Sequence, residues 1–185
     1  MRWRHPEFGL MTPKSFLKIA ESSGIVKELS DWALAHSLKT AAKWPVNGKG
    51  TPSLSVNISA EQFRRTDLTA WLLSLIEGAQ FDPARLILEL TETVVMEDMN
   101  RSAKLMHQIK AMGIRLAIDD FGTGYSSLGY LKHLPFCALK VDRIFVEDLP
   151  GSKQDMAMLD AIVSMAKTLN MSVIAEGVEE EAQLA

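Results

Sequence analysis

Short apolar segments alternate with longer segments of helical periodicity along most of this chain. Apolar residues at i, i+3 and i+4 spacing are typical of amphipathic helices, whereas short apolar runs between turn signals are typical of strands. The predicted strands are 54–58, 86–91, 114–119, 138–142 and 172–176. The predicted helices are 13–22, 26–44, 61–79, 98–112, 126–134 and 154–169. This alternation predicts an α/β fold with a parallel sheet and crossover helices.

Side chains within the first four predicted strands divide into an apolar face and a polar face. Successive side chains of a strand point to opposite sides of the sheet, so each strand turns one row toward the helices and one row away from them. Glu176 ends the fifth strand, and Asp120 continues the chain into a turn. The polar row is a costly feature unless it has a function. Its members are Ser55, Asn57, Ser59, Glu89, Asp119, Lys140 and Asp142.

Helices on one face of a sheet and polar side chains at the strand ends on the other are typical of a closed (β/α) barrel. The active site of such a barrel lies at the carboxyl ends of its strands. An open, doubly wound sheet is the alternative. A complete barrel takes eight strand-helix units and typically about 250 residues. Five predicted strands in 185 residues therefore predict an incomplete TIM-like barrel.

Composition narrows the possible classes of protein. With 47% hydrophobic residues, the chain is expected to form a single domain over residues 1–185. Its net charge of −3 lacks the basic excess of a protein that binds a nucleic-acid polymer. A single cysteine, Cys137, excludes an internal disulfide, and no apolar run is long enough to span a membrane. We expect a cytoplasmic segment without membrane contact, and leave open whether a longer parent protein is tethered to the inner membrane.

The polar row offers oxygen ligands for a metal. Glu89, Asp119, Asp120 and Glu176 lie at neighbouring strand ends, with the amide of Asn57 beside them. Such a group, without histidine or cysteine, suits Mg²⁺ or Mn²⁺ better than zinc or iron. Two such ions can stabilise both the attacking and the leaving oxygen when water attacks a phosphodiester. Lys140 on the same row could lower the pKa of that water or hold a phosphate oxygen.

Each of these residues also has a purely structural interpretation. Asp119 and Asp120 could cap the turn into the following helix. Glu89 could form a structural salt bridge with Lys140, and Asn57 could be a turn residue or a hydrogen-bonded core amide. Their joint occurrence at successive strand ends favours a metal site over these separate interpretations.

Five motifs follow one another along the chain: Val56-Asn-Ile-Ser59, Glu89-Leu-Thr-Glu92, Asp119-Asp-Phe-Gly-Thr-Gly-Tyr-Ser-Ser127, Leu139-Lys-Val-Asp142 and Ala175-Glu-Gly-Val-Glu179. In this order they resemble the motifs of the EAL domain family of bacterial cyclic di-GMP phosphodiesterases, and the resemblance covers essentially the whole chain. The resemblance implies a barrel of the EAL type and a hydrolase that opens cyclic di-GMP to linear pGpG with two Mg²⁺ or Mn²⁺ ions.

The resemblance also implies roles for particular residues. Lys140 and Glu176 would be catalytic, and Arg2 and Asp142 would bind the substrate. Glu92, Gly122 and Gly124 would support the loop after Asp120, which in this family also contributes to dimer contacts, so a homodimer is expected. The implied metal ligands are Asn57, Glu89, Asp119, Asp120 and Glu176.

Two family motifs lie outside this sequence. The Glu-Ala-Leu signature would precede Arg2, and a Gln-Gly motif would follow Ala185. On this basis we expect one metal ligand to be missing and hydrolysis by this chain to be impaired. Two alternatives stay open: a module that binds cyclic di-GMP without cleaving it, and a module that only dimerises. Metal-dependent turnover distinguishes the enzyme from both, and ligand binding distinguishes the two alternatives.

Overall fold

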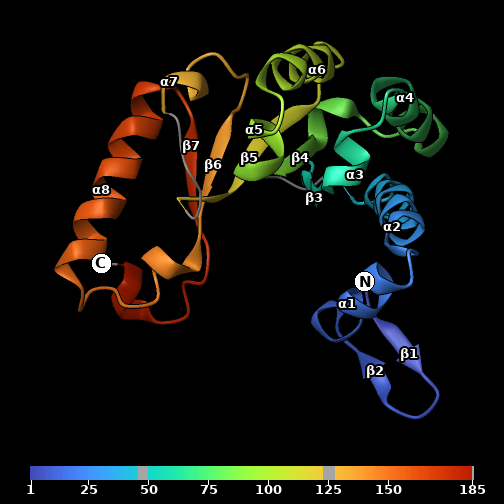
Figure 1. Ribbon diagram of the computed structural model, residues 1–185, viewed down its shortest axis with the longest axis horizontal. Coiled ribbons are helices and arrows are strands. Elements are labelled where there is room, and N and C mark those ends of the chain that lie inside the picture. Colours follow the sequence, from blue (N-terminus) through green and yellow to red (C-terminus); the bar gives the residue numbers. More distant parts are fainter. Residues whose placement is uncertain (46–49, 123–127, 185) are drawn as a thin grey trace. The chain divides into compact units, whose positions relative to one another are not determined.

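The computed structural model describes residues 1–45, 50–122 and 128–184 (Figure 1). The chain forms two compact units. The first comprises Met1–Leu54 and Ile58–Asp82, and the second comprises Ser55–Asn57 and Pro83–Ala185. In the described part of the chain, no helix is long and apolar enough to cross a membrane.

The first unit begins with a small antiparallel hairpin and continues with helices. Strands β1 (Trp3–His5) and β2 (Gly9–Met11) pair with Trp3 opposite Met11. This hairpin was not predicted from the sequence, because three-residue strands are too short to establish an alternating pattern. The helices that follow are α1 (Pro13–Ser22), α2 (Val26–Ala41), α3 (Ala60–Phe63) and α4 (Leu68–Ala79).

The predicted helix 61–79 is divided into α3 and α4. A capping box starts α3: Ser59 Oγ accepts from the backbone N–H of Gln62, and the Gln62 side chain accepts from the backbone N–H of Ser59. Arg65, in the connection between the helices, forms ion pairs with Asp31 of α2 and with Asp67. α4 then buries Leu68, Leu72 and Ile76 at helical spacing and packs against α2.

The second unit is built on a sheet whose strands coincide closely with the predicted ones. Its strand order is β3-β4-β5-β6-β7, and the pairs from β4 to β7 are parallel. The strands are β3 (Leu54–Asn57), β4 (Leu86–Thr91), β5 (Arg115–Phe121), β6 (Ala138–Val141) and β7 (Ser172–Ala175). The parallel sheet with crossover helices confirms the predicted α/β class. Among the described residues, β3 and β7 are its edges, as expected of an incomplete barrel.

The apolar row of the sheet forms the core of this unit, as the alternation predicted. The side chains of this row that are at most 1% exposed are Leu86, Leu88, Leu90, Leu116, Ile118, Leu139 and Val141. Helix α6 (Met99–Ala111) packs against β5, and α8 (Lys153–Thr168) packs against β7 (Figure 1). α6 is the predicted helix 98–112, shorter by one residue at each end, and α8 is the predicted helix 154–169, which begins and ends one residue earlier than predicted.

Short elements connect the strands of the second unit. A five-residue helix that was not predicted, α5 (Glu92–Met96), follows β4 directly. The predicted helix 126–134 corresponds to α7 (Leu128–Leu131), and its first two residues lie outside the described part. The remaining elements are the 3₁₀ turns η1 (Pro83–Arg85), η2 (Arg143–Phe145) and η3 (Glu181–Leu184).

Candidate functional site

Lys140 of β6 is the centre of the polar row. Its Nζ lies 2.9 Å from Oε2 of Glu89 on β4, 2.8 Å from Oδ1 of Asp119 on β5 and 2.6 Å from Oε1 of Glu176, which follows β7. Glu89, Asp119 and Lys140 are each less than 9% exposed. The structure therefore brings residues that are up to 87 positions apart in the sequence to one ammonium group.

The charge of Lys140 is maintained by these carboxylates. Burial of the side chain lowers the pKa of its ammonium, but hydrogen bonding and charge attraction from Asp119, Glu176 and Glu89 outweigh burial, and the pKa lies above its usual value. Lys140 is therefore a cation at neutral pH and cannot serve as a proton acceptor. Its positive charge compensates for carboxylates that would otherwise be costly to bury.

Glu89 is held by donors from two strands. Ser55 Oγ donates to Oε1 at 2.5 Å, and Asn57 Nδ2 donates to Oε2 at 3.1 Å, the oxygen that also accepts from Lys140 at 2.9 Å. The salt bridge between Glu89 and Lys140 that was considered as an alternative is thus present. The sequence analysis placed Ser55 on the polar face of the first predicted strand but assigned it no role. The signal was its position two residues before Asn57, on the same side of the strand.

A β-bulge brings two consecutive aspartates to the same site. Ile118 pairs with Leu139 and Phe121 with Val141, so two residues of β5 lie opposite the single residue Lys140 of β6. Asp120 has a left-handed backbone, with φ of +52°, a conformation that aspartate tolerates better than most residues. Regular alternation would direct the two aspartates to opposite faces. With the bulge, one oxygen each of Asp119, Asp120 and Glu176 lies within 4.8 Å of the others.

The donor set of this group fits a hard divalent cation. It consists of three carboxylates, which is the chemistry that Mg²⁺ and Mn²⁺ prefer. Asp119 is buried, and its Oδ1 lies 2.8 Å from Nζ of Lys140. The pKa of Asp120 is raised by burial and by repulsion from Asp119, Asp142 and Glu176, which Lys140 only partly offsets. A bound cation would relieve that repulsion.

Replacing Asp120 by asparagine should raise the melting temperature of the metal-free protein by a few degrees, because the change removes a carboxylate that its neighbours repel. Since the pKa of Asp120 is raised in the folded protein, the native state holds this proton more tightly than the unfolded chain. Stability is then lost as the pH rises through the interval between the two pKa values. The advantage of Asp120→Asn should therefore be larger at about pH 8 than at about pH 4.

Scanning calorimetry in EDTA at both pH values measures this difference. Asp160→Asn, on the exposed side of α8, is the control and should change little. A melting temperature of Asp120→Asn at or below that of the wild type at the higher pH would contradict the repulsion.

The remaining predicted site residues lie in several places. Glu92 is the first residue of α5 and is 4% exposed. Asp142 caps η2, because its Oδ1 accepts from the backbone N–H of Ile144 at 2.9 Å. Gly122 has φ of +96°, and Gly124 lies outside the described residues. Arg2 belongs to the first unit, where its Nη1 donates to the carbonyl of Met1 at 3.0 Å.

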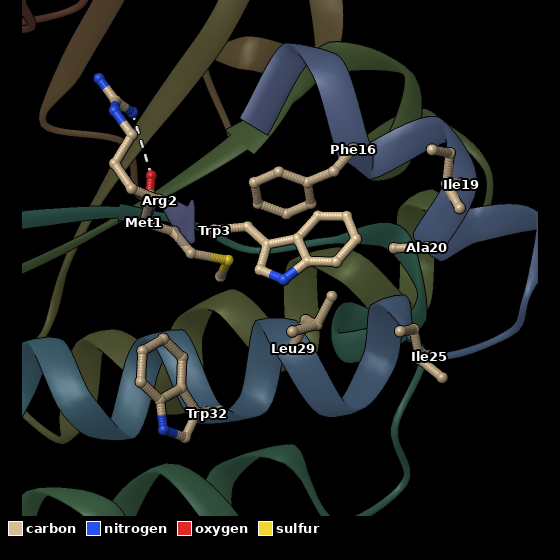
Figure 2. A pocket seen from close by; sticks show the side chains of 9 residues that line it. All are labelled: Met1, Arg2, Trp3, Phe16, Ile19, Ala20, Ile25, Leu29 and Trp32. Carbon is tan, nitrogen blue, oxygen red and sulfur yellow. Dashed lines mark hydrogen bonds between the residues drawn. The ribbon is translucent and has the colours of Figure 1, made fainter. Parts of the chain in front are cut away.

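The first unit contains an apolar pocket with a volume of about 560 Å³. Figure 2 shows the rings of Trp3 and Phe16 next to each other, in edge-to-face contact, with Leu29 and Trp32 of α2 on the opposite side of Trp3 from Phe16. Arg2 is the charged residue of the lining, and no carboxylate contributes to it. Since the pocket offers no metal ligand and no acid-base group, we assign the chemistry to the carboxylate cluster of the second unit.

Comparison with known proteins identifies a matching family and relatives that are named as cyclic di-GMP phosphodiesterases. The EAL domain family model matches residues 1–185. The chain is 42% identical over 183 residues to the bifunctional diguanylate cyclase/cyclic di-GMP phosphodiesterase MucR of Pseudomonas aeruginosa, covering 99% of the chain and 27% of that protein. It is 40% identical over 185 residues to the cyclic di-GMP phosphodiesterase NbdA of the same organism, covering 100% and 24%. The chain thus spans about a quarter of the length of these curated relatives.

Two solved structures of similar proteins also match nearly the whole chain. The phosphodiesterase PaMucR in complex with c-di-GMP matches with a TM-score of 0.91 and 42% identity, covering 98% of this chain and 74% of that one. The EAL enzyme Bd1971 with bound cAMP and cyclic di-GMP matches with a TM-score of 0.88 and 32% identity, covering 98% and 50%.

Proposed function

Because this chain belongs to the EAL domain family, we propose that its carboxylate cluster takes part in the metal-dependent hydrolysis of cyclic di-GMP to linear pGpG. The observation that carries the proposal is the convergence of Asp119, Asp120 and Glu176 beside Lys140. Relatives that match nearly the whole chain are named as phosphodiesterases of this dinucleotide.

Asp119, Asp120 and Glu176 would hold two Mg²⁺ or Mn²⁺ ions, together with Asn57 and Glu89. When bound, such ions supply positive charge that stabilises the attacking and leaving oxygens of a phosphodiester. The amide nitrogen of Asn57 donates to Glu89, and we infer that its carbonyl oxygen is the atom that faces the metal. Ser55 would orient Glu89 through its hydrogen bond.

Glu176 and Lys140 would act on the reacting groups. The side chain of Glu176 is 38% exposed, whereas those of Glu89 and Asp119 are 10% and 9% exposed. Glu176 is therefore the carboxylate around Lys140 that is best placed to accept a hydrogen bond from an entering water. Lys140 stays protonated, so it would stabilise negative charge on a phosphate oxygen or on the attacking water and would not remove a proton.

Other expected roles are part of the same proposal. Arg2 and Asp142 would contact the substrate, and Glu92, Gly122 and Gly124 would support the loop that follows Asp120. We also retain the homodimer, the single domain and the cytoplasmic location as predictions. Lys140 provides local positive charge for a substrate with two phosphates, although the chain as a whole has a net charge of −3.

The test is a hydrolysis assay of the purified protein with cyclic di-GMP in excess Mn²⁺, with separation of the products by chromatography. Because hydrolysis by this chain is expected to be impaired, we expect pGpG to form slowly with Mn²⁺ and no product to form after EDTA treatment. Binding of cyclic di-GMP by calorimetry without any product would refute the enzyme and would favour a receptor. Absence of both binding and product would leave only the dimerisation module.

A further inference from the structure

The 3₁₀ turn η2 contacts the backbone beside two of the three clustered carboxylates. The turn begins three residues after Lys140, and its residues Arg143 and Phe145 approach Gly177 and Gly122 respectively. Gly177 directly follows Glu176, and Gly122 is two residues after Asp120. One short turn thus lies against both chain segments that carry these carboxylates.

The contact at Gly122 leaves no room for a side chain. A Cβ atom at this position would lie 2.7 Å from Cε2 and 2.8 Å from Cζ of Phe145. The backbone has φ of +96°, which also favours glycine. The edge of the Phe145 ring therefore rests directly on the main chain that leaves Asp120.

The contact at Gly177 is equally close. A Cβ atom there would lie 2.6 Å from Cβ and 3.5 Å from Cα of Arg143, and the φ of Gly177 is +75°. Both atoms of Arg143 belong to or adjoin its backbone, so they cannot move aside as the end of a long side chain could. The main chain that leaves Glu176 is therefore packed on the η2 turn itself.

Hydrogen bonds hold η2 and the segment after Glu176 together. Asp142 caps the start of the turn through Ile144. Gln183 Nε2 donates to the carbonyl of Val146 at 3.0 Å, while its Oε1 accepts from the backbone N–H groups of Glu179 and Glu180 at 2.7 and 2.9 Å. The end of η2 is in this way connected to the loop that begins at Gly177.

We propose that the η2 turn is a positioning element for the metal site, and that Phe145 is the residue through which it keeps Asp120 close to Glu176. The inference rests on the proposed function in taking a divalent cation as the ligand of these carboxylates. Carboxylates that converge without a cation repel one another, so their loops need a support that prevents them from separating. Metal ligands must be held within about 0.5 Å of their working positions, and residues packed behind them provide this precision.

The test compares Mn²⁺ binding by Phe145→Ala, Phe145→Tyr and the wild type, measured by electron paramagnetic resonance of the free ion. We expect the dissociation constant of Phe145→Ala to rise about tenfold, which is the lower range for loss of an outer partner of a metal ligand. Phe145→Tyr keeps the ring and should bind like the wild type. Ile144→Ala is the matched control, because Ile144 is in the same turn, is 47% exposed and does not supply the atoms nearest to a Cβ at either glycine, which belong to Phe145 and Arg143.

A change in metal affinity must be separated from a loss of folding, so melting curves by circular dichroism accompany the titrations. If Phe145→Ala does not fold, Gln183→Leu replaces it, because that change removes the connection between η2 and the segment after Glu176 without altering the turn. Gln183→Leu should weaken Mn²⁺ binding in the same direction. A folded variant whose Mn²⁺ affinity stays within about twofold of the wild type, or falls no more than that of Ile144→Ala, would overturn the proposal.

The Mn²⁺ affinities of the variants are measured independently of cyclic di-GMP hydrolysis, so the two proposals can fail separately. A wild-type protein that binds Mn²⁺ but does not cleave cyclic di-GMP would refute the proposed function, and the role of η2 would still be decided by the affinities. A wild type that cleaves the dinucleotide, with a Phe145→Ala variant that binds Mn²⁺ equally well, would refute the role of η2 alone. A wild type that does not bind Mn²⁺ would refute both.

Discussion

Replacement of Asp119 by asparagine should lower the rate of cyclic di-GMP hydrolysis by more than about 100-fold, because loss of a metal ligand exceeds the 10–100-fold cost of losing its outer partners. Asparagine keeps the shape of the side chain but removes the charge that would bind the cation. The buried carboxylate of Asp119, whose Oδ1 lies 2.8 Å from Nζ of Lys140, would become a neutral amide, whose oxygen is a weaker metal ligand. The rate should be measured under saturating Mn²⁺, so that loss of turnover is separated from reduced metal affinity.

Asp160→Asn provides the control for this change, because it removes the same charge from an exposed position on α8. It should leave hydrolysis unchanged. Asp119→Asn with wild-type turnover would show that Asp119 is not a ligand, and would favour its interpretation as a structural partner of Lys140.

Replacement of Lys140 by methionine should destabilise the metal-free protein by about 3–5 kcal/mol, the usual cost of removing one partner from a buried ion pair. Methionine fills a similar volume but leaves Glu89, Asp119 and Glu176 without the cation that they share. Urea denaturation at neutral pH in EDTA measures this loss. Hydrolysis should also fall sharply, because the ammonium that would stabilise charge at the phosphate is absent.

The pH dependence of this variant has a definite sign. The pKa of Lys140 is raised in the folded wild type, so its contribution to stability is fully present below the usual pKa of lysine and is lost as the pH rises through the folded value. The difference in stability between the variant and the wild type should therefore stay constant around neutral pH and become smaller only in strongly alkaline solution.

Lys167→Met is the matched control, because Lys167 lies at the exposed end of α8. It should change the free energy of unfolding by less than about 0.5 kcal/mol, as is usual for surface substitutions. A Lys140→Met variant as stable as this control at neutral pH would contradict the shared ion pair. Partial recovery of stability on adding Mn²⁺ is expected, since a cation would then replace the missing ammonium.

Much of the second unit could be predicted from the sequence. Strand β4 was predicted with its observed bounds, and β3, β6 and β7 each end one residue earlier than predicted. Strand β5 begins one residue later and ends two residues later than predicted. The reason is that strands with one buried face require apolar residues at alternate positions, so each strand can be recognised from its own short segment of sequence. The hairpin β1–β2 and helix α5 were missed because each is too short to show a period.

The residues of the polar row could also be predicted from the sequence, but the hydrogen bonds and ion pairs between their side chains could not. Alternation placed Glu89, Asp119 and Lys140 on one face, and parallel pairing of adjacent strands brings such residues together. Which atoms meet depends on register and on rotamers, and neither follows from residue spacing. The hydrogen bond from Ser55 to Glu89 and the cap that Asp142 provides for η2 are of this kind.

The sequence by itself determined that the chain is α/β, that carboxylates and a lysine end neighbouring strands, and that its motifs are those of the EAL family. Only the tertiary structure decided that Asp119 and Asp120 act on the same side of the sheet, because the alternation rule places consecutive residues on opposite faces. The bulge at Asp120 overrides that rule. It depends on how β5 pairs with β6, which is a contact between segments distant in the sequence. The packing of η2 against Gly122 and Gly177 likewise exists only once the loops are assembled, since no local pattern encodes a contact between them.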